Sequence, residues 1–198
     1  MKKINTAQLK QLVEAAIFVA EKPISKQELK DSVLGEFEVA DRTLSKIVNE
    51  LQRDYQPRGI QLVEVASGYR FQSLDALSPW LSKLWQENAP KYSRAMLETL
   101  ALIAYRQPIT RGEIEQVRGV AVSSNIMKTL TERGWVSLVG HKEVPGRPAL
   151  YATTKTFLDY FSLSSLSDLP SADAFETMTE NEQSSSSLKV LNEAPSNQ

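Results

Sequence analysis

The sequence predicts an α+β, mostly helical fold: two tandem winged helix-turn-helix domains joined by a helical connector and followed by a disordered C-terminal tail. The main observation is a repeat. Residues 16–29 (AIFVAEKPISKQEL) align without a gap to residues 101–114 (ALIAYRQPITRGEI), at an offset of 85 residues, the difference between Pro108 and Pro23. Each copy precedes a further helical pattern and two short strand patterns. A period this much longer than a solenoid unit indicates two similar small domains in tandem.

Two helices separated by a proline begin the first copy. Apolar residues at helical spacing over residues 7–21 predict an amphipathic helix, which Pro23 ends. Ser25, followed three positions later by Glu28, predicts a capping box that opens the second helix. In such a box the serine hydroxyl accepts from the backbone N–H three residues on, and the glutamate accepts from the N–H of the cap residue.

A third helix and a hairpin complete the first copy. Asp41 is expected to cap a helix over residues 41–55, in which apolar side chains recur at helical spacing. Alternating apolar residues over 60–65 and 69–72 predict two antiparallel strands, with the turn at Ser67 and the glycine after it. Three helices and a hairpin in this order predict a winged helix-turn-helix.

The second copy has the same order of elements. Thr110 and Glu113 form its capping box, and residues 135–139 and 149–153 form its strands. A short helix over residues 155–161 is expected to close the fold with Phe157, Leu158 and Phe161 facing inward.

The segment between the copies predicts a connecting helix over residues 75–87, which Ser78 and Pro79 start. Its two tryptophans, Trp80 and Trp85, suggest that it packs against a domain. The chain is therefore expected to divide into an N-terminal winged-helix domain (dimerisation), a helical connector, a C-terminal winged-helix domain and a disordered acidic, serine-rich tail, at residues 1–74, 75–92, 93–170 and 171–198.

Composition excludes several classes of protein. The hydrophobic content of 41% and charged content of 24% are those of an ordinary soluble domain, and no apolar run reaches membrane-spanning length. The chain has no cysteine, which fits a reducing compartment and excludes disulfides and zinc ribbons. The net charge of −1 divides into −4 for residues 171–198 and +3 for the rest, short of the charge expected of a DNA reader.

No catalytic constellation is evident, so the sequence predicts no enzyme, no cofactor, no metal and no small-molecule substrate. The single histidine, His141, has no cysteine to share a metal with. Glu113 and Glu115 have the spacing of an acid–base pair, but the capping box already explains Glu113. The phosphate-binding loop pattern is also absent.

The third helix of a winged helix can enter the major groove of DNA. In the first copy its charges balance, since three basic residues are matched by three acids within residues 41–54. Such a helix gains no net attraction to phosphates. The second copy is only weakly better, with Lys128 and Arg133 against Glu132. Duplex recognition by the second copy stays open, but the sequence does not indicate it.

Two features suit contact with a protein partner. The loop between the strands of the second copy (HKEVPGRPALY, residues 141–151) presents Arg147 between two prolines, which indicates either a rigid turn or a preorganised contact for an acidic or carbonyl-rich partner. The first helix has an apolar stripe wider than one face, around Leu12, Ala16 and Phe18. This helix is either buried by its own domain or also touches a partner.

Several separate motifs occur in the order typical of one family. Residues 94–111, residues 142–151 (KEVPGRPALY), residues 157–161 (FLDYF) and the Ser-Asp-Leu-Pro ending at Pro170 closely resemble the bacterial segregation and condensation protein B family. The resemblance covers about residues 9–170 and is strongest in the second copy.

This resemblance implies a non-enzymatic subunit of a condensin-like Smc–kleisin complex, required for chromosome condensation and partition during cell division. The protein would be cytoplasmic and nucleoid-associated. It would form a homodimer and bind the kleisin, segregation and condensation protein A, and through it the Smc ATPase heads. DNA contact would be indirect or weak. We expect the dimer interface at Leu12, Ala16 and Phe18, and the kleisin contact at the loop residues Lys142, Gly146, Arg147 and Pro148.

The alternative is a winged-helix DNA-binding transcriptional regulator that uses the second copy. The two hypotheses separate by salt, because the affinity of a DNA reader for duplex falls steeply as the salt concentration rises.

Overall fold

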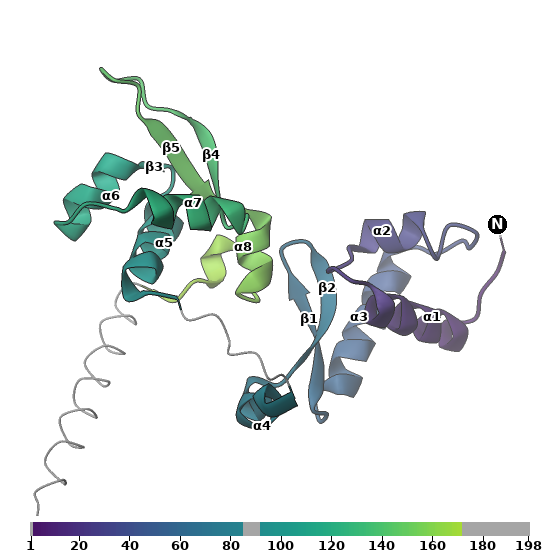
Figure 1. The fold of residues 1–198 in the computed structure, drawn as a ribbon. Coiled ribbons are helices and arrows are strands. Elements are labelled where there is room, and N and C mark those ends of the chain that lie inside the picture. The colour runs from purple at the N-terminus through teal and green to yellow at the C-terminus, as the bar shows by residue number, and fades with distance from the viewer. Residues whose placement is uncertain (1, 85–91, 172–198) are drawn as a thin grey trace, which may run out of the picture. The chain divides into compact units, whose positions relative to one another are not determined.

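The computed structural model describes residues 2–84 and 92–171. Within them, two winged-helix domains follow one another (Figure 1). The first consists of three helices and a hairpin: α1 (Thr6–Val19), α2 (Lys26–Asp31), α3 (Asp41–Tyr55), β1 (Ile60–Val65) and β2 (Gly68–Ser73). The tandem winged-helix prediction is confirmed. The predicted tail falls almost wholly outside the described residues.

The core of the first domain is built from the apolar stripes of its three helices, closed by the hairpin. Buried side chains recur at helical spacing on α1 and α3, and β1 buries Leu62 and Val65. The cluster consists of Leu9, Val13, Ala16, Ile17, Leu29, Leu34, Leu44, Ile47, Val48, Leu51, Leu62 and Tyr69.

The caps of the first domain agree with the sequence at α2 and differ at α3. Ser25 and Glu28 form the complete capping box. The prediction that Asp41 caps α3 is wrong: Ala40 occupies the cap position, without a side-chain hydrogen bond. The Asp41 carboxylate instead accepts from Lys30 Nζ at 2.7 Å, so an ion pair with the preceding helix competes for the group that would have capped.

The hairpin closes against the break between α1 and α2. Ile24 and Tyr69 exchange both backbone hydrogen bonds, at 3.0 and 2.9 Å. Gly68, which begins β2 with φ +145°, lies so close that a Cβ would stand 2.3 Å from the backbone of Ile24. Only glycine therefore fits at this point of the hairpin.

The connector is not the continuous helix that the sequence predicted. The 3₁₀ turn η1 (Asp75–Leu77), the single turn α4 (Ser78–Leu81) and the 3₁₀ turn η2 (Ser82–Leu84) follow one another. The serines that begin α4 and η2 favour local turns over an extended helix. Trp80 is 64% exposed, so its predicted packing against a domain is wrong, and Trp85 lies outside the described residues.

The second domain repeats the plan with additions: α5 (Arg94–Arg106), β3 (Ile109–Thr110), α6 (Arg111–Arg118), α7 (Ser124–Glu132), β4 (Val136–His141), β5 (Ala149–Thr153), α8 (Lys155–Tyr160) and the 3₁₀ turn η3 (Leu166–Asp168). The strands form an antiparallel sheet in the order β3-β5-β4. The two-residue strand β3 was not predicted.

Aromatic packing distinguishes the core of the second domain. Trp135 is 2% exposed, and its ring centroid lies 4.6 Å from that of Tyr160 and 5.5 Å from that of Phe161. Phe157, also buried, stacks on Phe161. The predicted closing helix is therefore confirmed as α8, with Phe157 buried. Phe161, also predicted to face inward, follows the helix and is 40% exposed, because it packs on Trp135 from the outside.

Hydrogen bonds join the first hairpin to the end of α8. The backbone N–H and the hydroxyl of Ser67 donate to the two carboxylate oxygens of Asp159 at 2.9 and 2.6 Å, and the N–H of Ala66 donates to the carbonyl of Leu163 at 3.0 Å. The described residues up to Leu166 form one compact unit. The domain boundaries drawn from the sequence remain a prediction.

Candidate partner-binding surfaces

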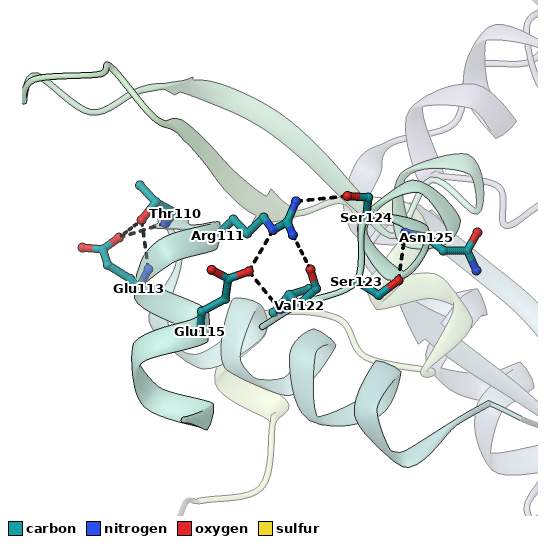
Figure 2. Close-up of polar contacts among 8 residues, drawn as sticks. All are labelled: Thr110, Arg111, Glu113, Glu115, Val122, Ser123, Ser124 and Asn125. Carbon is teal, nitrogen blue, oxygen red and sulfur yellow. Dashed lines mark hydrogen bonds and ion pairs between the residues drawn. The ribbon is translucent and has the colours of Figure 1, made fainter. Parts of the chain in front are cut away.

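The turn between α6 and α7 is held by one arginine (Figure 2). Arg111 Nε donates to Glu115 Oε1 at 3.0 Å, Nη1 donates to Ser124 Oγ at 3.2 Å, and Nη2 donates to the carbonyl of Val122. Glu115 in turn accepts from the N–H of Val122 at 2.9 Å. The sequence analysis missed this network, although an arginine four residues before a glutamate on one helix was a usable signal.

The two carboxylates that resembled an acid–base pair are both occupied structurally. Glu113 completes the capping box with Thr110 and also accepts from Lys142 Nζ. The Lys142 ammonium, followed by the hydrogen bonds from Thr110, lowers the pKa of Glu113 to about 2. The hydrogen bond from Val122, followed by that from Arg111, holds the pKa of Glu115 below its ordinary value. Both groups are ionised acceptors, which is the wrong state for a general acid at neutral pH.

The four loop residues predicted to bind the kleisin have different roles in the structure. Lys142 is tied to Glu113, and its backbone N–H donates to the carbonyl of Pro148 at 2.9 Å. Gly146 (φ +86°) and Arg147 (φ +38°) turn the loop. The Arg147 side chain is 72% exposed, with only a 3.5 Å ion pair to Glu143. Arg147 is thus presented to solvent, and Lys142 anchors the base of the loop.

The same wing exposes apolar side chains that the sequence analysis did not single out. Leu138 and Val139 on β4 are each 54% exposed, and Val144 in the loop is 42% exposed. A shift in the pairing register between Leu138 and Gly140 interrupts the strict alternation of faces along β4. Val144 lies in the same loop turn as Arg147, and an exposed apolar side chain next to an arginine is the composition expected of a protein-binding patch.

The residues predicted for the dimer interface lie in different environments. Ala16 is 8% exposed and belongs to the core of its own domain, so it offers almost no surface to a partner. Leu12 is partly buried against that core. Phe18 is 69% exposed and Val19 is 74% exposed, at the end of α1. Helical spacing could not separate these positions because the apolar stripe runs over both faces.

The described residues offer no site for a metal. Among residues 2–84 and 92–171, no group of three or more histidine or carboxylate side chains is placed to hold an ion. His141 ends β4 and is exposed. In the same part of the chain, no helix combines the length and apolar character needed to cross a membrane.

Comparison with known proteins identifies the family. The family described as "Segregation and condensation complex subunit ScpB" matches residues 11–172. The chain belongs to this family. A relative from Coxiella burnetii, "Segregation and condensation protein B homolog", is 54% identical to this ScpB chain over 159 residues, which are 80% of this chain and 76% of the relative.

Two solved ScpB structures were also matched. The structure of ScpB from Mycobacterium tuberculosis shares 31% sequence identity with this chain. The match covers 82% of this chain and 99% of the Mycobacterium chain, with a TM-score of 0.38. The second structure is a dimer of an ScpB N-terminal domain complexed with a ScpA peptide, and it shares 29% sequence identity with this chain. The match covers 43% of this chain and 99% of that domain, with a TM-score of 0.35. The family resemblance stated from the sequence is confirmed for this ScpB chain by the family match and the Coxiella relative.

Proposed function

We propose that the chain is a non-enzymatic subunit of a condensin-like Smc–kleisin complex that condenses and partitions chromosomes during cell division. It acts in the cytoplasm at the nucleoid, as a homodimer that binds the kleisin and, through it, the Smc ATPase heads. The observation that carries the proposal is the family match over residues 11–172, to a subunit of a segregation and condensation complex. The occupied carboxylates of the second domain support a role without catalysis.

The exposed end of α1 supports the dimer. Phe18 and Val19 are adjacent large apolar side chains, and the ring of Phe18 lies 6.4 Å from that of Phe71 on the hairpin. Leaving such a pair in water costs about 1.5–3 kcal/mol for each side chain that a partner would bury. The interface that we propose therefore centres on Phe18, with Leu12 at its edge and Ala16 beneath it.

The wing of the second domain supports the kleisin contact. Arg147 is held out by the positive φ of Gly146 and by a hydrogen bond from its own N–H to the carbonyl of Val144 at 2.9 Å. A backbone fixed in this way lowers the entropy lost when a partner binds. Val144, which is 42% exposed in the same turn, would add buried apolar area beside the arginine.

Light scattering tests the whole proposal. The purified chain should be a dimer, and addition of the central fragment of the kleisin should shift it to a larger complex. A species that stays unchanged in mass when the fragment is added contradicts the kleisin assignment.

Two exposed variants with matched controls localise the contacts. Phe18→Glu should dissociate the dimer, whereas Val120→Glu, at a 57% exposed apolar site of the second domain, should not. Arg147→Ala should weaken kleisin binding about tenfold, whereas Arg94→Ala, at an 89% exposed arginine, should leave it unchanged. Circular dichroism establishes that each variant is folded. If a variant and its control had the same effect on dimerisation or on kleisin binding, that residue would not belong to the proposed interface.

A further inference from the structure

The outward face of α3 carries a row of basic residues. Leu44, Ile47, Val48 and Leu51 face the core. On the opposite side, Arg42, Lys46, Asn49 and Arg53 follow the spacing i, i+4, i+7 and i+11, and all four are exposed. At a rise of about 1.5 Å per residue, the row is about 16 Å long.

Two of the three acids of α3 pair closely with lysines of other helices, whereas Glu50 lines the same surface as Arg42, Lys46 and Arg53. Asp54 accepts from Lys10 Nζ of α1 at 2.6 Å, and Glu50 lies 3.7 Å from the same ammonium. Asp41 pairs with Lys30 of α2. In the described part of the chain, no ion pair involves Arg42 or Arg53. Lys46 reaches Glu50 only at 3.9 Å and is 75% exposed, a distance and exposure at which a pair contributes little.

This arrangement changes the charge that a partner would meet. Residues 41–55 alone carry three basic and three acidic side chains, a sum of zero. Adding Lys10 and Lys30, which pair with those acids, and Glu14, which lies beside Lys10, gives a local charge of +1. The sequence analysis judged the helix neutral because it counted α3 alone.

Amide side chains continue the basic row toward the hairpin. Asn49, Gln52 and Arg53 of α3 line a surface groove together with Gln56, which follows the helix, and Gln61 of β1. Asparagine and glutamine both donate and accept hydrogen bonds, and they pair with base edges or with phosphate oxygens. A helix carrying Arg, Lys and Asn along its outward row has the composition of a major-groove helix.

We propose that the outward face of α3 binds duplex DNA, with Arg42, Lys46 and Arg53 contacting phosphates. This surface goes beyond the proposed kleisin function and does not depend on it. The position agrees with the fold, since α3 is the third helix of the helix-turn-helix and the B-DNA major groove, about 12 Å wide, admits an α-helix.

The corresponding helix of the second domain lacks these features. On α7, Lys128 is the one basic residue, so no row of cations forms. An acidic protein segment would meet the same cations on α3, but the amide groove beside them favours a nucleic acid, whose bases and phosphates use both donors and acceptors.

Fluorescence anisotropy of a labelled duplex of about 20 base pairs tests the proposal with the full-length chain. Binding should weaken as salt rises from 50 to 200 mM, with a slope of log K against log salt of about −0.9 per phosphate contact, or about −3 for three contacts. The triple variant Arg42→Gln, Lys46→Gln, Arg53→Gln should lose at least tenfold in affinity at low salt and most of that slope.

A matched triple variant controls for net charge. Arg94→Gln, Lys128→Gln and Lys155→Gln also remove three exposed cations, all in the second domain and one on α7. This control should bind the duplex within about twofold of the wild type. Equal losses in the two variants, or a wild-type chain without salt-dependent binding, would overturn the proposal.

Two further measurements complete the test. Retained kleisin binding by the α3 variant shows that the chain is folded and separates this inference from the proposed function. Tighter binding of a polyglutamate peptide than of the duplex, lost in the same variant, would contradict the duplex assignment and favour an acidic protein partner.

Discussion

Ser25 and Thr110 occupy equivalent places in the two winged-helix domains, and each is the N-cap of a complete capping box. The residue before each cap pairs with a tyrosine of the second hairpin strand: Ile24 with Tyr69, and Ile109 with Tyr151. The joint between the first two helices and the hairpin is thus built twice from the same interactions. These interactions are local or backbone-mediated, so they tolerate changes in the rest of the surface.

The hairpins and third helices differ in what they leave exposed. The first hairpin turns tightly at Ser67, which is hydrogen-bonded to Asp159, whereas the second ends in a long loop that displays Arg147. Conversely, the third helix of the first domain, α3, exposes Arg42, Lys46 and Arg53, whereas its counterpart α7 carries one lysine. One scaffold therefore presents its helix in one copy and its wing in the other. The following predictions test that contrast, from the largest effect to the smallest.

The cores should respond differently to the loss of an aromatic ring. Trp135→Ala removes the buried centre of the aromatic cluster and should cost about 4 kcal/mol of unfolding free energy. Hydrogen exchange should show loss of protection in α5–α8 with protection retained in α1–α3. A uniform loss over both domains would show that they unfold as one unit.

The two hairpins should differ in their tolerance of a Cβ. Gly68→Ala places a methyl group 2.3 Å from the backbone of Ile24 and should cost about 3 kcal/mol. Gly146→Ala meets no atom within 4 Å and should cost about 1 kcal/mol, from its positive φ alone. Urea denaturation measures both. Similar costs would contradict the tight closure of the first hairpin.

The two capping boxes should be nearly equivalent. Ser25→Ala and Thr110→Ala should each cost about 1 kcal/mol, because each removes one acceptor for a backbone N–H at a helix start. Thermal unfolding of the two single variants measures the difference. A cost above about 2 kcal/mol at one site alone would show that the repeated joint is not equally important in both copies.

Acid should distinguish the two capping glutamates. The pKa of Glu113 is lowered from 4.5 to about 2, mainly by the hydrogen bond from Lys142 and further by those from Thr110. The pKa of Glu28 is lowered only by its hydrogen bonds from Ser25. A depressed pKa contributes stability that is present above pH 4.5 and lost as the pH falls through about 2. Glu113→Gln should therefore flatten the stability profile between pH 4.5 and 2 more than Glu28→Gln. The reverse order would contradict a role for Lys142.

Most of the fold could be predicted because its signals are local. The capping boxes, the helix stripes and the hairpin alternation each depend on residues a few positions apart. What failed depends on distant partners. Asp41 does not cap because Lys30 competes for it, and β3 exists only because Tyr151 and Leu150 pair with it.

The candidate surfaces were harder to predict for the same reason. Ala16 and Phe18 are two residues apart on one helix, and only packing shows that one is covered and the other exposed. The sequence analysis counted the charges of α3 alone, because Lys10 lies forty or more residues before Glu50 and Asp54, with which it pairs. Arg147 was placed correctly at the loop tip, since proline and glycine fix a turn without distant help.

Gly68 also helps to explain how a chain with two similar domains avoids pairing the helices of one domain with the hairpin of the other. The hairpin of the second domain has Leu150 at the equivalent position, one residue before its tyrosine. A side chain there would collide with the backbone of Ile24, so the later hairpin is a poor substitute for the earlier one. During synthesis the first half can complete its own pairing before its rival emerges from the ribosome. Because Gly68 has no side chain, the first domain is expected to pair with its own hairpin and not with that of the second domain.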